Sequence, residues 1–177
     1  MPKRTNYLTW TDYFTSIARL VAQRSKDPST QVGAVIVNPD NNTLISTGYN
    51  GFPRGCSNDD FPWGNGKLEE KTFSKISADF TSNSVWLNSK YPYVVHAEAN
   101  ALIHARQNCT GFALYTTLFP CNECAKLIIQ AGIKKIYYLD IIENEVWKES
   151  FQATQRMFKS AGVVSERVNY QPKKKTP

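Results

Sequence analysis

Two short stretches, residues 96–98 (His-Ala-Glu) and residues 120–124 (Pro-Cys-Asn-Glu-Cys), constrain the fold of this 177-residue chain more than any other feature. Each stretch holds side chains that bind metals, and each leads into a run of residues typical of a helix. The proline suits a helix start because it has no N–H to lose, and the two cysteines are spaced so that both sulfur atoms lie on one side of that helix. We therefore expect two helices to start close together and to bring His96, Cys121 and Cys124 around one ion.

Three protein ligands are typical of a catalytic zinc site, because a structural zinc site uses four and leaves no position for water. Zinc lowers the pKa of a water molecule in that open position towards neutrality. Glu98 follows the histidine by two residues and can carry protons to and from such a water. The sequence therefore predicts one zinc ion per chain, held by His96, Cys121 and Cys124, with Glu98 as the catalytic acid and base.

Two other interpretations of the same cysteines remain open at this point. Cys56, Cys109 or His104 could supply a fourth ligand and make the zinc site a structural one. Cys121 and Cys124 could instead form a redox pair, since C-x-x-C is also a redox motif. The histidine, the glutamate and the preceding proline favour the catalytic interpretation.

The length and composition indicate one globular domain, which we expect to span residues 1–170. The four cysteines are too few for a disulfide framework, so a reduced, cytoplasmic location is expected. The first residues are polar, and no apolar run is long enough to cross a membrane. Part of the net charge of +6 comes from lysines at residues 173–175, and we expect residues 171–177 to form a disordered basic tail rather than a nucleic-acid-binding segment.

Hydrophobic periodicity and turn residues predict alternating helices and strands along the chain. The predicted helices are residues 9–24, 97–106, 121–131 and 145–160. The predicted strands are residues 32–37, 43–47, 112–118, 136–139 and 163–168, of which the first two form a hairpin. This order indicates an α/β fold with three α-β-α layers, in which helices cover both faces of a central mixed sheet of about five strands.

Two segments between these elements are unusually long or rich in glycine. Residues 58–92 form a long insertion, with a short helix expected at residues 67–80. Residues 48–56 contain three glycines and a proline, which favour unusual backbone angles. We interpret this second segment as a binding loop that carries Asn50 and Arg54 into a site, rather than as a plain turn.

The sequence resembles the deoxycytidylate (dCMP) deaminases, which belong to the zinc-dependent cytidine and deoxycytidylate deaminase family. The H-x-E…P-C-x-x-C pattern described above is a general signature of zinc deaminases that act on nucleobases. Longer matching stretches are more specific, and they are residues 24–34, 48–51, 91–101 and 118–132. The resemblance implies the cytidine deaminase-like fold and the hydrolysis of dCMP to dUMP and ammonia, a step that feeds thymidylate synthesis.

The resemblance also implies substrate contacts. It assigns the zinc-binding and proton-carrying roles to the residues already named for them. Contacts with the nucleotide are expected from Ser25, Lys26, Asn50 and the backbone of Ala97. The substrate phosphate requires a cation, which Arg24 or Lys26 would supply because the end of the first helix is itself negative.

Many members of the family are homohexamers that dCTP activates and dTTP inhibits, so the resemblance implies the same partners and assembly here. The effector site of such enzymes involves the glycine-rich loop, which points to effector contacts at Gly51, Arg54 and Gly55. Mg²⁺ is expected only together with a triphosphate effector. Some viral relatives bind a second zinc ion, but Asp27 stands here where a cysteine would help, and one zinc per chain is expected.

Three alternative functions remain open from the sequence. The enzyme could accept dCTP as well as dCMP, because one loop decides how many phosphates fit. A deaminase of tRNA or another polynucleotide would use the same zinc chemistry, with aromatic residues stacking on bases beside a basic groove. A zinc-stabilised regulatory module would need no catalytic glutamate, so Glu98 argues against it. The expected partner is a small nucleotide rather than a nucleic acid or a membrane.

Overall fold

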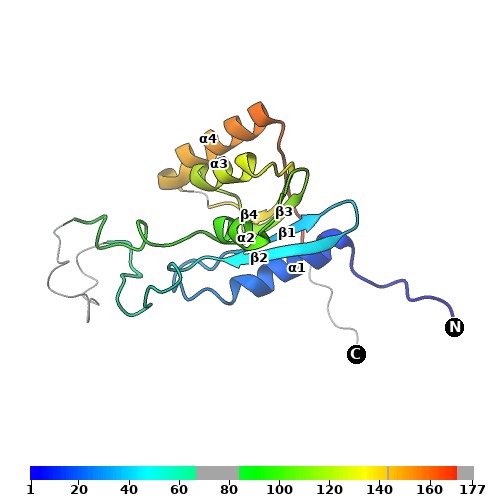
Figure 1. Ribbon diagram of the computed structural model, residues 1–177, viewed down its shortest axis with the longest axis horizontal. Helices are drawn as coiled ribbons and strands as arrows, with labels where there is room; N and C mark the ends of the chain where they lie inside the picture. Colours follow the sequence, from blue (N-terminus) through cyan, green and yellow to red (C-terminus); the bar gives the residue numbers. More distant parts are fainter. Residues whose placement is uncertain (67–83, 143, 171–177) are drawn as a thin grey trace.

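Five strands form one mixed sheet in the computed structural model, which describes residues 1–66, 84–142 and 144–170 (Figure 1). The strands are β1 (Gly33–Asn38), β2 (Thr43–Tyr49), β3 (Ala113–Leu118), β4 (Lys135–Asp140) and β5 (Val164–Arg167). Their order in the sheet is β2-β1-β3-β4-β5. β1 pairs antiparallel with β2 and with β3, whereas β3, β4 and β5 are parallel to one another. The prediction of a mixed five-stranded sheet is therefore confirmed.

Helices cover both faces of this sheet (Figure 1). Among the described residues, α1 (Trp10–Ala22) covers one face, and α2 (Ala97–Ala105), α3 (Asn122–Gln130) and α4 (Glu145–Ala161) cover the other. Since successive residues of a strand point to opposite faces, Val35 and Val37 of β1 pack with α1, while Ala34 and Ile36 pack on the side of the three helices. Burial on both faces explains why β1 is a continuous apolar run, and the three-layer prediction is confirmed.

The residues that directly precede the four helices differ in whether their side chains cap the helix. Thr9 and Asn144 cap α1 and α4 in the usual way, because their side-chain oxygens accept backbone N–H bonds from the first turn at 3.1 and 3.0 Å. His96 and Cys121 stand at the same position before α2 and α3, with extended backbones, yet neither side chain makes a capping bond. Both side chains therefore remain available for another partner.

The bounds of all nine elements lie within two residues of the predicted ranges. The helix that begins beside Cys121 starts one residue later than predicted, so that the cysteine stands at the position just before the helix instead of belonging to it. The short helix expected at residues 67–80 and the basic tail at residues 171–177 lie outside the described residues. The expected domain of residues 1–170 stays a prediction.

Gly48 allows β2 and α2 to approach each other at backbone contact. A Cβ atom at this position would lie 2.2 Å from the carbonyl oxygen of Ala97 and 2.3 Å from the backbone nitrogen of Ala101. Both alanines are buried, and their side chains are single methyl groups. Glycine on the strand and alanine on the helix therefore set the start of α2, and with it His96, close against the sheet.

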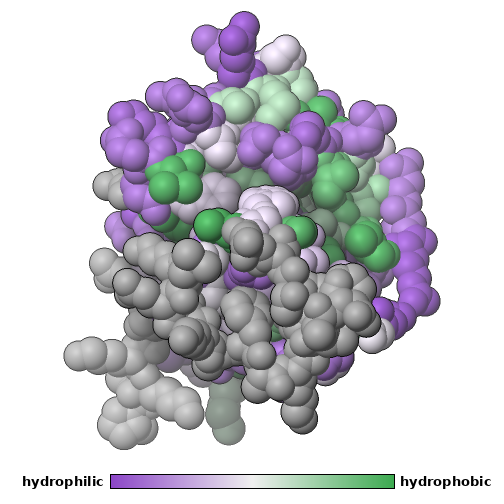
Figure 2. Space-filling view, turned by 90° about the vertical axis from the view of Figure 1, so that its left-hand side faces the viewer, coloured by the Kyte–Doolittle hydropathy of each residue, from purple (hydrophilic) through white to green (hydrophobic). Residues whose placement is uncertain are grey.

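The surface at one end of the molecule carries hydrophilic and hydrophobic side chains in small separate patches, where atoms of the described residues are visible (Figure 2). Across residues 1–66, 84–142 and 144–170, no helix combines the length and the apolar character needed to cross a membrane.

Candidate active site

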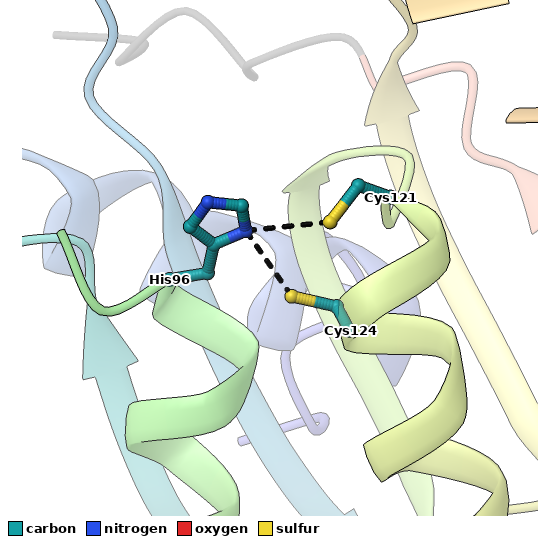
Figure 3. Close-up of side chains that lie close together, drawn as sticks. All are labelled: His96, Cys121 and Cys124. Atoms are coloured by element: carbon teal, nitrogen blue, oxygen red, sulfur yellow. Dashed lines mark hydrogen bonds between the residues drawn. The ribbon is translucent and has the colours of Figure 1, made fainter. Parts of the chain in front are cut away.

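His96, Cys121 and Cys124 converge where the starts of α2 and α3 meet (Figure 3). The Nδ1 atom of His96 lies 3.4 Å from the Sγ atom of Cys121 and 3.3 Å from that of Cys124. All three ligand atoms lie within 4.8 Å of one another. The predicted meeting of two helix starts thus brings the three predicted ligands to one point.

The spacing of these atoms fits a tetrahedral zinc ion. Zinc bonds of about 2.1 Å to nitrogen and about 2.3 Å to sulfur, at tetrahedral angles, separate the two ligand atoms by about 3.6 Å. Within the described residues, no fourth histidine, cysteine or acidic ligand joins the group. His104 instead lies 3.1 Å from the carbonyl oxygen of Thr47, and the Cys109 thiol points to a backbone carbonyl. The donor set is therefore the open, three-ligand kind that catalytic zinc sites use.

The electrostatics of the ligand group favour a bound cation. Interaction with the Cys124 thiol lowers the pKa of Cys121 to about 4, and the hydrogen bond with Cys121 raises the pKa of His96 to about 9. The hydrogen bond between Cys124 and Cys121, together with burial, raises the pKa of Cys124 well above its usual value. Without a metal, the group thus holds a thiolate beside protonated partners, and a metal ion would displace those protons.

Glu98 lies in the first turn of α2 directly beside the ligand group. Its side chain is buried, with 4% of the residue exposed, and Oε2 lies 3.5 Å from the Sγ atom of Cys124. Burial raises the pKa of this carboxyl above its usual value. A carboxyl with a raised pKa is suited to take up and release a proton near neutral pH.

A pocket of about 350 Å³ opens beside these residues. Five predicted site residues line it, namely Asn50, His96, Ala97, Glu98 and Cys121. Much of the remaining wall is apolar or aromatic, and it includes Val32, Val94, Leu118, Phe119, Trp147 and Phe151. A pocket that combines an apolar and aromatic wall with convergent polar groups is typical of a small-molecule site.

The other predicted contact residues lie outside this pocket wall. Ser25 supports it indirectly, because its hydroxyl donates a hydrogen bond of 2.9 Å to the backbone oxygen of Asn50. Lys26, Arg54 and Gly55 are exposed and do not line the pocket. Gly51, which pairs with Val95 through an isolated bridge, does not line it either. Their roles as substrate or effector contacts stay predictions.

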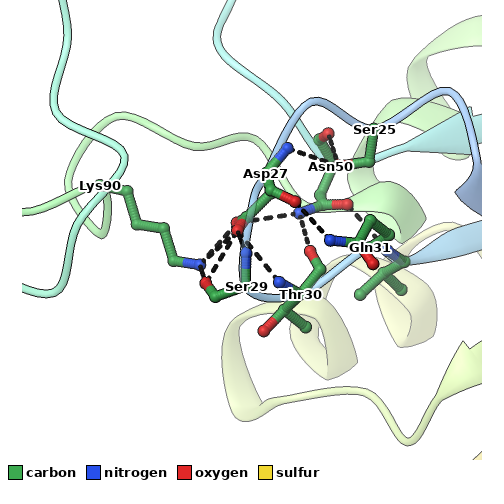
Figure 4. Close-up of polar contacts among 8 residues, drawn as sticks. Ser25, Asp27, Ser29, Thr30, Gln31, Asn50 and Lys90 are labelled. Carbon is green, nitrogen blue, oxygen red and sulfur yellow. Dashed lines mark hydrogen bonds and ion pairs between the residues drawn. The ribbon is translucent and has the colours of Figure 1, made fainter.

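Sequence reasoning missed a buried ion pair in the pocket wall (Figure 4). Lys90 Nζ lies 2.6 and 2.8 Å from the two carboxylate oxygens of Asp27. Burial raises the pKa of this carboxyl, but the bonds from Lys90 and from the backbone amides of Ser29 and Thr30 lower it by more, so that the pKa lies below its usual value. The available signal was Asp27, an acid inside the matching stretch 24–34, which we interpreted only as the replacement of a cysteine.

Sequence reasoning also missed the aromatic wall that Trp147 and Phe151 of α4 supply. Trp147 and Phe151 lie four residues apart in the helix predicted at residues 145–160. Both line the pocket, as does Tyr91 from the segment before α2. The ring centroids of Tyr91 and Trp147 lie 6.4 Å apart. The spacing of Trp147 and Phe151 indicated a buried face but not that part of it faces a pocket.

Comparisons with known proteins agree with this site. A family model described as the cytidine and deoxycytidylate deaminase zinc-binding region matches residues 8–140. The probable deoxycytidylate deaminase of Drosophila melanogaster is 47% identical over 175 residues, which cover 98% of this chain and 78% of the relative. The deoxycytidylate deaminase of Homo sapiens is 45% identical over 164 residues, which cover 91% of this chain and 80% of the relative.

Solved structures show the same architecture. The dCMP deaminase from the cyanophage S-TIM5, in complex with dCMP and dUMP, is 27% identical with a TM-score of 0.62, and the match covers 89% of this chain and 95% of that one. Acinetobacter baumannii RibD is 23% identical with a TM-score of 0.57, and the match covers 89% of this chain and 35% of that one. The second likeness concerns the fold alone.

Proposed function

Because this chain belongs to the cytidine and deoxycytidylate deaminase family of enzymes, we propose that it hydrolyses dCMP to dUMP and ammonia. The observation that carries this proposal is the convergence of His96, Cys121 and Cys124 beside the buried Glu98, at the wall of a nucleotide-sized pocket. The relatives of similar sequence are named as deoxycytidylate deaminases, and the cyanophage relative was solved with dCMP and dUMP.

His96, Cys121 and Cys124 would hold one zinc ion, which when bound supplies a water molecule of lowered pKa. Glu98 takes one proton from the attacking water and delivers it to the neighbouring ring nitrogen. It then takes the second proton from the hydroxyl group that has been added to the ring carbon and delivers it to the amino group, which leaves as ammonia while the C=O bond forms. The buried position and raised pKa of Glu98 suit it to alternate between the two protonation states. One water is consumed, one C–N bond is broken, and one ammonia leaves for each dUMP formed.

The nucleotide contacts are proposed for Asn50 and Ala97 in the pocket and for Ser25 and Lys26 near it. Ala97 is the first residue of α2, where backbone N–H groups have no partner within the helix and can meet a carbonyl oxygen of the base. Asn50 would contact the sugar side of the nucleotide from the end of β2. Lys26 is exposed next to the pocket wall at Asp27, where its ammonium could reach a phosphate at the mouth.

The proposal also includes regulation by nucleotides and assembly into an oligomer. dCTP would activate and dTTP would inhibit, with contacts from Gly51, Arg54 and Gly55 and with Mg²⁺ accompanying the triphosphate. Arg54 is exposed and Gly55 has a φ of +90°, a conformation that opens the loop backbone to a ligand. We propose a homohexamer that acts in the cytoplasm and feeds thymidylate synthesis, without nucleic-acid or membrane partners.

Initial rates on dCMP, dCTP and deoxycytidine test this function. We expect turnover of dCMP to exceed that of the other two, and dTTP to lower it. Equal rates on dCMP and dCTP would indicate a dual enzyme instead. No turnover of dCMP, together with tight and salt-sensitive binding of tRNA or single-stranded DNA, would contradict the proposal.

A further inference from the structure

The ion pair between Asp27 and Lys90 is buried in the wall of the nucleotide pocket (Figure 4). The side chain of Lys90 is 11% exposed and that of Asp27 is 2% exposed. Lys90 belongs to the segment that leads into His96, whereas Asp27 belongs to the loop before β1. A pair in this position ties two otherwise separate parts of the pocket wall together.

Both members of the pair are fully engaged with protein groups. The Asp27 carboxylate accepts hydrogen bonds from the backbone N–H and hydroxyl of Ser29, both at 2.9 Å, and from the backbone N–H of Thr30 at 3.1 Å. The Lys90 ammonium donates to the two Asp27 oxygens and, at 2.6 Å, to the Ser29 hydroxyl. Since an ammonium group has three N–H donors, Lys90 has none left for a ligand phosphate.

The remaining acceptor site of Asp27 holds the amide of Asn50. The Nδ2 atom of Asn50 donates to Asp27 Oδ2 at 3.4 Å and to the carbonyl oxygen of Thr30 at 2.9 Å. Its Oδ1 atom accepts the backbone N–H of Val32 at 2.9 Å. Both N–H donors of the Asn50 amide are therefore used. The Oδ1 atom can accept one further hydrogen bond, which suits a hydroxyl donor such as that of a sugar.

We infer that Asp27 and Lys90 are positioning residues, which together fix the Asn50 amide in the orientation that receives the nucleotide. The inference rests on the proposed function, because it takes Asn50 to contact the substrate. Loss of Lys90 would leave a buried carboxylate without its counter-ion, and loss of the Asp27 charge would release both Lys90 and Asn50. Neither residue acts on the reacting atoms, so the effect falls on nucleotide affinity rather than on the chemical step.

Steady-state kinetics on dCMP with Asp27→Asn and Lys90→Met test the inference, with zinc content and Tm measured on each variant. We expect each substitution to raise KM about tenfold while kcat changes by less than about threefold. One zinc per chain should be retained. If Lys90→Met fails to fold, the double variant D27N/K90M, which leaves no buried lone charge, should show the same rise in KM. Wild-type KM in the folded variants, or a loss confined to kcat and zinc content, would overturn the inference.

Two comparisons separate positioning from direct contact. Asn50→Ala alone should raise KM, and adding Asp27→Asn to it should raise KM no further, because both act through one amide. If the increases in KM of the two single variants multiply in the double variant, Asp27 does not act through Asn50. A rise in KM for Lys90→Met but not for Asp27→Asn would show that Lys90 binds the phosphate itself, which also overturns the inference.

The exposed pair Lys135–Glu166, with an N–O distance of 3.2 Å, supplies a matched control. The double variant K135M/E166Q removes the same two charges outside the pocket, and its KM should match that of the unchanged chain. A wild-type chain that does not deaminate dCMP would overturn the proposed function, and this inference with it. If the wild type deaminates dCMP and Asp27→Asn has the same KM as the wild type, this inference is overturned but the proposed function is not.

Discussion

The Nδ1 atom of His96 lies 3.3 Å from the Sγ atom of Cys124, although the two residues are 28 positions apart and belong to different helix starts. Each helix contributes the positive end of its dipole to the same point. Such a position favours anions, and Cys121, whose pKa is lowered to about 4, is a thiolate before any metal binds. The chemistry of the site is therefore built into the way α2 and α3 meet.

Glu98→Gln should nearly abolish turnover while leaving the metal site intact. The substitution keeps the size of the side chain but removes its ability to take up and release a proton. We expect kcat for dCMP to fall by about 10³-fold, with zinc content and Tm close to those of the unchanged chain. Ammonia release and metal analysis provide the measurement. Glu166→Gln, an exposed acid on β5, should keep full activity, and unchanged ammonia release by Glu98→Gln would remove this residue from the mechanism.

Zinc affinity should weaken as the pH falls. In the metal-free chain His96 has a pKa of about 9 and Cys124 a raised pKa, so both carry a proton near neutral pH that a metal must displace. Release of two protons corresponds to about a 100-fold loss of affinity for each unit by which the pH is lowered between about pH 8 and pH 7. Above about pH 9 His96 is already neutral, so only the Cys124 proton is released and the loss is about tenfold for each unit.

Chelator competition over a series of pH values measures this slope, and calorimetry in buffers of different ionisation enthalpy counts the protons directly. A zinc affinity independent of pH between about pH 7 and pH 8 would show that the ligands are already deprotonated in the free chain. Cys109→Ser, which changes a buried thiol outside the ligand group, should leave the slope unaltered.

The sequence was sufficient for the sheet, the helices and the ligand group because each depends on local pattern. A short apolar run identified β1, apolar periodicity identified α1, and short fixed spacings identified Cys121 and Cys124. The extent of each element was less certain, since a helix end such as Ala22 depends on whether the following turn finds other hydrogen-bond partners.

The polar wall of the pocket could not be predicted in the same way. Asp27 and Lys90 are 63 residues apart, and Lys90 falls in a segment that the sequence presented as an insertion. Only the folded chain brings them together. Trp147 and Phe151 illustrate the same limit, because an amphipathic pattern indicates that a face is buried without indicating whether core or pocket lies opposite.

The Asp27–Lys90 pair should stabilise the fold only above the pH at which Asp27 titrates. The folded state lowers the pKa of this carboxyl below its usual 3.8, so its contribution is fully present above the pKa of the unfolded chain and is lost as the pH falls through the lowered folded value. At neutral pH, Asp27→Asn should lower the free energy of unfolding by about 3 kcal/mol, because it leaves Lys90 buried without a counter-ion.

Urea unfolding of the unchanged chain and of Asp27→Asn, measured from neutral pH downward, checks this dependence. The difference between the two should stay constant above about pH 5 and shrink below about pH 4, where the protonated aspartic acid resembles asparagine. The exposed K135M/E166Q variant should differ little from the unchanged chain at any pH. A difference that grows towards low pH would mean that the folded state raises the pKa of Asp27 instead.

Gly48→Ala should displace the start of α2 and weaken the metal site from a distance. The added methyl carbon would lie 2.2 Å from the carbonyl oxygen of Ala97 and 2.3 Å from the backbone nitrogen of Ala101, and backbone atoms cannot move aside as a flexible side chain can. We expect a loss of about 3 kcal/mol or more in the free energy of unfolding, together with a reduced zinc content, because His96 precedes the displaced helix directly. Gly51→Ala is the matched control, since a methyl group there meets no atom within 4 Å, and its Tm and zinc content should stay close to those of the unchanged chain. Equal behaviour of the two variants would show that α2 is not held by its contact with β2.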